Sequence, residues 1–199
     1  MYRFVPFLFI FLSFVLYAGP LNKGVLDFIT SKWKLNNTQQ EYLSQQKVLA
    51  LSEVETKNSG QEFKLKAAAL VPKKCYKAIR VISNFELYST WISFIKSSSY
   101  NPKSRLLTLR ADHTLLPYPM IIYIIVDRPT KEGKYPFLFP TGLFDGLKGE
   151  FEIKEINNQC VLYAHSYWKG KKTKIPDLII EVFSETLSKI GGEILMRKI

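Results

Sequence analysis

The chain has 199 residues, of which 47% are hydrophobic, and it carries 28 Lys and Arg against 17 Asp and Glu. This length suits one domain with a single core, and no second core is needed. The net charge of +11 either favours an anionic surface as a partner or serves solubility alone, and because no motif that reads DNA or RNA is present, we expect no nucleic-acid partner.

Residues 1–19 have the layout of a secretory signal peptide. Arg3 precedes an apolar run from Phe4 to Tyr17, and the small residues Ala18 and Gly19 follow it. The run is shorter than the roughly 20 residues that a membrane-spanning helix needs. We therefore expect an exported protein, periplasmic or secreted, with an uncleaved leader that anchors the chain as the alternative.

Residues 20–46 are expected to form an amino-terminal extension before the main domain. The part up to residue 37 shows no clear period, whereas Thr38 and Glu41 match a capping box and predict a short helix to about Gln46. The main domain is expected over residues 47–199.

The main domain begins with a predicted hairpin and two predicted helices. Residues 47–56 and 61–71 are strand-like and are separated by turn residues. Pro72 then opens a helical pattern, and the aromatic-rich residues 85–92 predict a second, short helix.

A run of strands and one long helix complete the domain. Apolar and polar residues alternate most clearly in two of the strands, which indicates a sheet with one covered face. The long helix begins at Pro176, and Gly191 and Gly192 inside it lower its local stability and allow a close approach. The predicted strands are 93–100, 105–113, 120–127, 148–156 and 159–168. The predicted apolar face of the helix is formed by Ile179, Val182, Phe183, Thr186, Leu187, Ile190 and Ile194.

The apolar stretch 134–147 is predicted to be a loop, because Pro136 and Pro140 each lack a backbone donor and glycines disfavour regular structure. An apolar loop either folds over the core, lines a cavity or contacts lipid. Residues 115–122 have the same character, and simple core packing of both segments remains an alternative.

The two cysteines, Cys75 and Cys160, can pair in an oxidising compartment. They fall in different predicted elements, and the sequence does not show whether their Cα atoms approach within about 7 Å. A disulfide and two buried thiols both remain open.

The order of the elements indicates an α+β fold. Residues 68–98 resemble the START-like superfamily, also called SRPBCC, which includes polyketide cyclases, coenzyme-Q-binding proteins and lipid-transfer domains. Asn84, Phe85, Tyr88 and Trp91 fill its pattern [D/N]-F-x-x-Y-x-x-W, with Asn in place of the commoner Asp. The likeness covers residues 47–199.

The resemblance implies a helix-grip fold, in which a curved antiparallel sheet wraps around a long carboxy-terminal helix and two short helices follow the first hairpin. It also implies a deep apolar cavity between the sheet and that helix. The exported leader is a departure from the cytosolic and mitochondrial members of the superfamily.

Catalytic machinery is not evident in the sequence. The two histidines, His113 and His165, occur without the spacing of a metal site, and no nucleophile elbow, P-loop or dinucleotide fingerprint is present. Glu181 and Glu185 lie on the polar side of the last helix, so we expect solvated charges. We therefore expect no enzyme, no metal and no cofactor.

The expected function is binding, with transfer as a further option, of a hydrophobic small molecule or lipid between the sheet and the last helix. A basic loop is a candidate contact for an anionic membrane surface, through Lys169, Lys171, Lys172 and Lys174. The candidate lining residues are Leu107, Leu109, Phe137, Phe139, Phe144, Phe151, Ile179, Val182, Phe183 and Thr186.

Two alternatives remain open. A cyclase or dehydratase acting on an aromatic or polyketide-like substrate requires Tyr163, His165 or Tyr167 to point into the cavity. A module with a filled core that docks on a membrane or a protein requires the absence of any internal void.

Overall fold

The computed structural model of the protein describes residues 21–58, 60–71, 73–114 and 118–199. The signal peptide expected over residues 1–19 lies outside the described residues. In the part that is described, no helix is both long enough and apolar enough to span a membrane.

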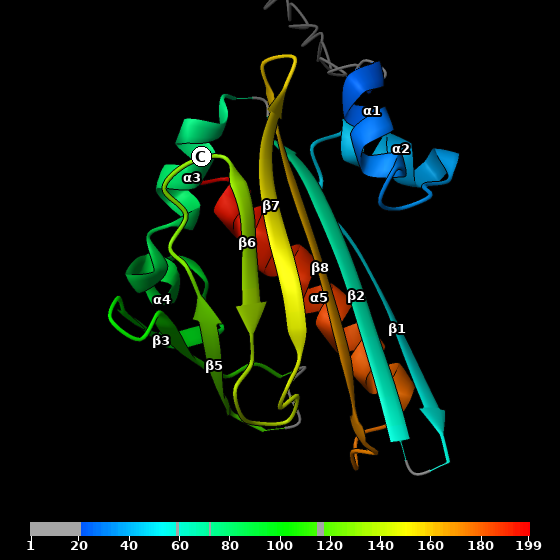
Figure 1. Cartoon of the computed structure of the whole chain (residues 1–199), viewed down its shortest axis with the longest axis vertical. Coiled ribbons are helices and arrows are strands. Elements are labelled where there is room, and N and C mark those ends of the chain that lie inside the picture. Colours follow the sequence, from blue (N-terminus) through cyan, green and yellow to red (C-terminus); the bar gives the residue numbers. More distant parts are fainter. Residues whose placement is uncertain (1–20, 59, 72, 115–117) are drawn as a thin grey trace, which may run out of the picture.

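One antiparallel sheet of eight strands forms the body of the domain (Figure 1). The spatial order is β1-β2-β8-β7-β6-β5-β4-β3, so the first hairpin joins the last strand and β1 and β3 are the two edges. The strands are β1 (Leu49–Lys57), β2 (Gly60–Val71), β3 (Ile95–Asn101), β4 (Leu106–Ala111), β5 (Met120–Val126), β6 (Gly133–Leu138), β7 (Lys148–Ile156) and β8 (Gln159–Lys171).

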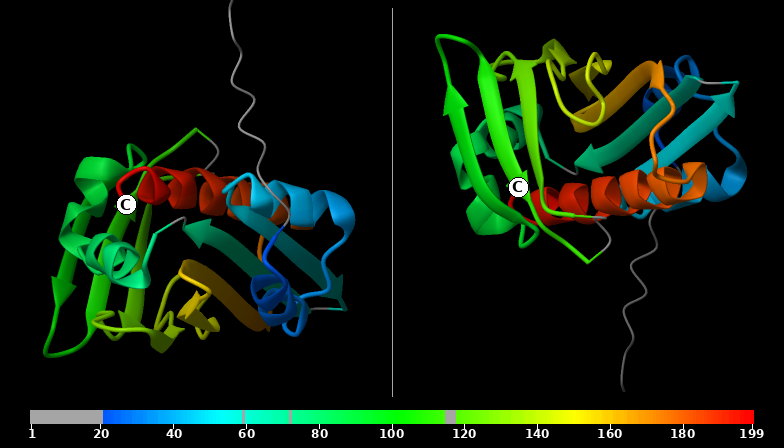
Figure 2. Two further views of the ribbon diagram at one scale, coloured as in Figure 1. Left: turned by 90° about the horizontal axis from the view of Figure 1, so that it is seen from above. Right: turned by 90° about the horizontal axis from the view of Figure 1, so that it is seen from below.

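Helix α5 (Asp177–Met196) lies across the inner side of the sheet, which curves around it (Figure 2). Three short helical elements connect β2 to β3: α3 (Cys75–Ile82), η1 (Phe85–Leu87) and α4 (Tyr88–Trp91). The expected α+β helix-grip fold is therefore present.

The residues that carry the family pattern belong to the core beside β3. Phe85 is 4% exposed, and its ring lies 5.7 Å from that of Tyr88 and 5.0 Å from that of Tyr100. The Tyr88 hydroxyl donates a hydrogen bond of 2.6 Å to the carbonyl of Ile82. The pattern is thus a packing motif that attaches the short helices to the sheet.

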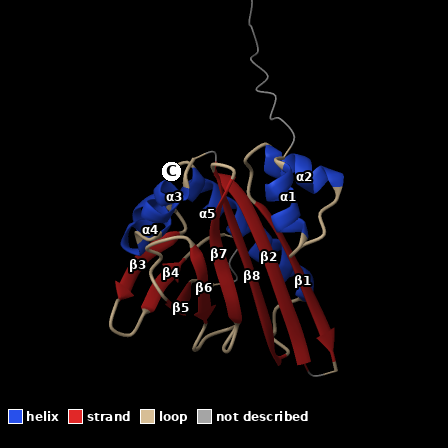
Figure 3. Ribbon diagram, turned by 45° about the horizontal axis from the view of Figure 1, so that its top comes forward, coloured by secondary structure: helices blue, strands red, loops and turns tan. Residues whose placement is uncertain are grey.

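Two further helices, α1 (Lys23–Thr30) and α2 (Asn37–Ser44), pack on the outer face of the sheet, opposite α5 (Figure 3). Val25 and Ile29 of α1 are fully buried in one cluster with Leu70 and Val161. The short predicted helix is present, but its capping box is formed by Asn36 and Gln39 rather than by Thr38 and Glu41. Helix α1 was not predicted, because it is capped by Asn22 alone, whose side chain accepts from the Gly24 N–H, and it has no capping-box pair.

Strand β6 was also not predicted, because Pro136 lies within it. A proline removes one ladder donor and is tolerated where pairing is incomplete. Strand β6 pairs along its length with β7 but with β5 only at two positions, Ile125 with Leu138 and Val126 with Phe137. Residues 134–138 are therefore strand, and the predicted loop is shorter than expected.

Cys75 and Cys160 form a disulfide with a Cα–Cα distance of 4.8 Å, which resolves the alternative left open by the sequence. The bond joins the start of α3 to the start of β8, across 85 positions of sequence. It fixes the short helices to the centre of the sheet.

Candidate ligand-binding cavity

A cavity of about 320 Å³, here called the first cavity, lies between α5 and the sheet. Strands β2, β3, β4, β5, β6 and β8 contribute wall residues, as does the connection after β6. Helix α5 contributes Phe183, Ser184, Leu187 and Ser188. The wall is mainly aliphatic and aromatic, which is typical of sites for apolar ligands.

A second cavity of about 230 Å³ follows along the same helix. Ser188 lines both cavities, so the two are neighbours. Small residues leave this space open: Ala67 and Ala69 on β2, Ala164 on β8 and Gly192 on α5. A Cβ atom on Gly192 would lie 3.0 Å from both γ-carbons of Val48, so this glycine permits the close approach of the helix to the chain before β1.

The connection between β6 and β7 forms one wall of the first cavity. Phe144 stacks on Phe63 with ring centroids 5.2 Å apart and meets Trp168 edge-on at 5.4 Å. The Trp168 indole nitrogen donates to the carbonyl of Asp145 at 2.9 Å, and Leu147 is 4% exposed. The apolar loop is therefore folded over the end of the sheet. Its aromatic side chains pack against the core and also line the first cavity.

The structure brings six of the ten candidate lining residues to the cavities. Five of the six line the first cavity, and Phe151 lines the second. Leu107 is on the inner face but is 4% exposed within the core beside Phe85, so it lines neither. The five residues of the first cavity are Leu109, Phe137, Phe139, Phe144 and Phe183.

Three other candidates, all on the last helix, do not line the cavities. Ile179 and Val182 are 46% and 51% exposed, and Thr186 lines neither cavity. The apolar residues surround most of α5, so the phase of the buried stripe was ambiguous. The structure turns Ile180, which is 1% exposed, toward the sheet instead.

Glu181 and Glu185 are also placed differently from the expectation of solvated charge. The Ser52 backbone N–H donates to Glu185 Oε1 at 2.7 Å, and the Val54 N–H donates to Glu181 Oε1 at 2.7 Å. The Thr56 N–H donates to Asp177 Oδ2 at 3.1 Å. We call Asp177, Glu181 and Glu185 the carboxylate seam.

The carboxylate seam forms because the spacing of the acids along the helix matches the spacing of the free N–H groups along the strand. Acids four residues apart on a helix are about 6 Å apart along its axis, and alternate N–H groups of a strand are spaced by about 6.6 Å. Strand β1 is an edge, so these N–H groups have no strand partner. Hydrogen bonds from Thr56 and then Gln61 hold the pKa of Asp177 below its ordinary value. The seam thus joins the sheet edge to α5 beside the cavities.

The aromatic and histidine side chains required by the cyclase alternative lie on the outer face. Tyr163 is buried against α1, and burial raises the pKa of its hydroxyl. His165 and Tyr167 alternate with the cavity-lining residues of β8 and are exposed. None of the three lines either cavity.

The described residues also offer little for a metal ion. Their one close cluster of potential ligands is Cys75, Glu132 and Glu155, and the thiol of Cys75 is already in the disulfide. This cluster lies apart from the cavities, whose lining includes none of the three.

An antiparallel sheet that grips a carboxy-terminal helix over apolar cavities defines the START-like fold class. Comparison with solved structures confirms this fold. A START superfamily protein from Mycobacterium smegmatis matches with a TM-score of 0.55 and 15% identity, over 68% of this chain and 95% of that one. The protein TTHA0849 from Thermus thermophilus matches with a TM-score of 0.56 and 11% identity, over 68% and 95%.

Ara h 8.0201 has the same fold, with a TM-score of 0.50 and 12% identity over 69% of this chain and 97% of that one. No protein-family model matches the chain, and no curated protein does so significantly. The likeness therefore concerns the fold alone.

Proposed function

We propose that the protein binds a hydrophobic small molecule or lipid in the first and second cavities. The observation that carries this proposal is the pair of adjoining cavities under α5, of about 320 and 230 Å³. Ligand sites typically occupy about 300 to 1,000 Å³. Contact with the apolar wall contributes roughly 25 cal/mol for each Å² of ligand surface that is buried.

The positions of Tyr163, His165 and Tyr167 favour binding over the cyclase alternative, because these groups face away from the cavities. The presence of cavities also favours a ligand over a filled core. The disulfide supports export to an oxidising compartment, which agrees with the leader-like pattern of residues 1–19.

Uptake of the neutral fluorescent probe N-phenylnaphthylamine tests the binding proposal. The delipidated protein should enhance the fluorescence of the probe with saturation at one or two equivalents, because the walls shield it from water. Palmitate or another long-chain competitor should displace it. A linear, unsaturable response would count against an internal site.

We further propose that the end of the molecule at the start of α5 docks on an anionic membrane surface. Leu178, Ile179 and Val182 are 65%, 46% and 51% exposed, an apolar patch directly after the basic loop. Lys169 is paired with Glu62 at 2.5 Å, so the loop's attraction depends mainly on three exposed lysines, Lys171, Lys172 and Lys174.

Replacing those three lysines by Gln should weaken binding to phosphatidylglycerol vesicles more than tenfold, since each cation near such a surface contributes about 1 kcal/mol. Cosedimentation with the vesicles measures the change. A matched triple replacement elsewhere should have a much smaller effect, and equal losses would show that only the total charge matters. The control replaces the exposed residues Lys77, Lys103 and Lys131.

A further inference from the structure

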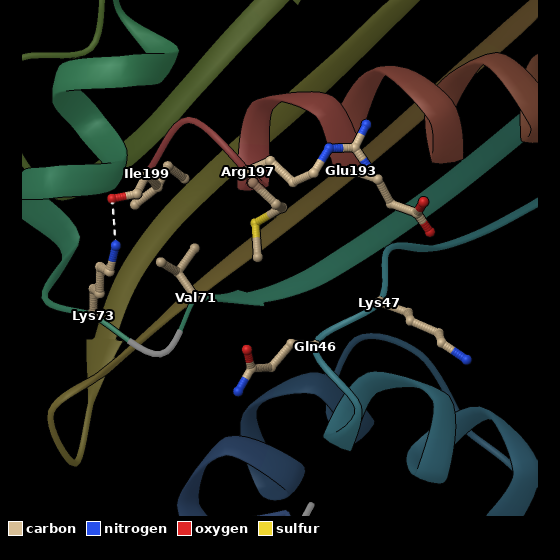
Figure 4. Close-up of a pocket in the computed structure, with 8 residues that line it drawn as sticks. Gln46, Lys47, Val71, Lys73, Glu193, Arg197 and Ile199 are labelled. Carbon is tan, nitrogen blue, oxygen red and sulfur yellow. Dashed lines mark hydrogen bonds between the residues drawn. The ribbon is translucent and has the colours of Figure 1, made fainter. Parts of the chain in front are cut away.

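A polar pocket of about 340 Å³ lies at the carboxy-terminal end of α5 (Figure 4). Its cations come from three separate parts of the chain: Lys47 before β1, Lys73 after β2, and Arg197 after α5. Glu193 is the acid in its lining, and Gln46 adds an amide. The three cations outnumber the two anions of the lining, which are Glu193 and the terminal carboxylate of Ile199.

The polar pocket adjoins the second cavity. Met196 and Ile199 line both of them. Since Ser188 joins the second cavity to the first, the lined space follows α5 from Phe183 to Met196. That is about 20 Å at the rise of an α-helix, a length comparable to an extended long acyl chain. Met196 has an unbranched, flexible side chain, which suits a boundary that a ligand must pass.

Charged side chains are confined to one end of this space. Among the described residues that line the first and second cavities, none carries a charged side chain. An ionised group would lose its hydration there without gaining a partner, at a large cost in free energy. The polar pocket, by contrast, offers cationic donors at the end of the same path.

Two of the cations have donors to offer a ligand. The Lys73 ammonium donates to a carboxylate oxygen of Ile199, the last residue of the sequence, at 2.6 Å, which uses one of its three N–H groups and matches part of its charge. Arg197 is exposed, and a guanidinium can hold a carboxylate or phosphate with two parallel hydrogen bonds. The Lys47 ammonium lies 5.0 Å from the ring centre of Tyr42 and adds to the positive field.

We propose that the ligand is a single-chain anionic amphiphile, with its chain along α5 and its carboxylate or phosphate head in the polar pocket, beside Arg197 and in the field of the other two cations. This inference rests on the proposed function and names the class of lipid that the cavities take. Glu193 opposes the anion from the last turns of α5, so removal of its charge should favour binding.

Displacement of N-phenylnaphthylamine by three probes tests the proposal. Palmitoyl lysophosphatidate and monopalmitoylglycerol differ only by a phosphate, and palmitate supplies the carboxylate head. We expect the anionic probes to bind at least tenfold more tightly than the neutral one, with a preference that declines as salt is added. The tighter of the two anionic probes identifies the head group.

The variant Arg197→Gln should weaken both anionic probes by about fivefold, as expected for an exposed charge pair, and leave monopalmitoylglycerol unchanged. Lys198→Gln removes the same charge from an exposed residue outside the pocket and should change nothing. Glu193→Gln should strengthen the anionic probes.

Equal binding of the neutral and anionic probes, or equal effects of the Arg197 and Lys198 variants, would overturn the head-group site while leaving the cavity as a binding site. Failure of every probe, including N-phenylnaphthylamine, would instead overturn the proposed function itself.

Discussion

Ser188→Phe should reduce the affinity for N-phenylnaphthylamine and for long-chain ligands by at least tenfold. Ser188 is the residue that lines both the first and the second cavity, so a phenyl ring at this position occupies the space where they meet. The ring would replace the ligand's own apolar contacts with the wall, and the path along α5 would be interrupted. Fluorescence titration measures the loss.

Val182→Phe is the matched control for this variant. It adds the same ring to the same helix, but on a side chain that is 51% exposed and lines neither cavity. Its affinity should equal that of the unmodified protein. Ala164→Leu, which fills the second cavity from β8, provides a milder second test if the ring at Ser188 disturbs folding. Unchanged ligand affinity in both filled variants would place the ligand elsewhere.

The double variant Glu181→Ala with Glu185→Ala should lower the free energy of unfolding by about 2 kcal/mol. Each carboxylate accepts a charge-assisted hydrogen bond, and its loss leaves the donating N–H group without a protein partner. Both carboxylates accept backbone N–H groups from the edge strand β1. Urea denaturation measures the change. Glu193→Ala removes an acid from the same helix that, among the described residues, accepts no hydrogen bond from β1, so it should have little effect.

The carboxylate seam should also make stability depend on pH through Asp177. The pKa of this group is held below its ordinary value in the folded protein. Its contribution is therefore complete above the unfolded-state pKa of about 3.9 and is lost as the pH falls from there through the folded-state pKa. Asp177→Asn should reduce that dependence, and an unaltered acid limb in this variant would show that the seam does not control it.

The fold could be predicted because its elements have clear local signals. Turn residues separate the two strands of the first hairpin, and β7 alternates apolar and polar residues. The long helix has a first-turn proline and acid. Helix α1 and strand β6 had weaker signals: the helix has no capping-box pair at its start, and the strand contains Pro136. Their formation depends on packing and pairing with distant segments.

The site was predicted in part, for a related reason. Phe137, Phe139 and Phe144 were recognised because aromatic residues in a loop need an apolar surrounding. Small residues such as Ala67, Ala164 and Ser188 were missed, since a residue that creates space by being small has no signal of its own. Three consecutive alanines inside β2 were the available clue, because strands normally favour larger side chains.

The carboxylate seam could not be predicted from the helix alone. Asp177, Glu181 and Glu185 lie at the spacing of an ordinary solvated face. Their role depends on the edge position of β1, which is a property of the strand order. Without that order, the same acids predict only solubility.

Native mass spectrometry of the protein purified from its own host, followed by organic extraction, tests the central claim most directly. The account predicts a stoichiometric excess mass that is released into the organic phase as a lipid or another hydrophobic molecule. An empty protein that also takes up neither fatty acids nor N-phenylnaphthylamine would contradict the account and would support an interaction module that carries no ligand.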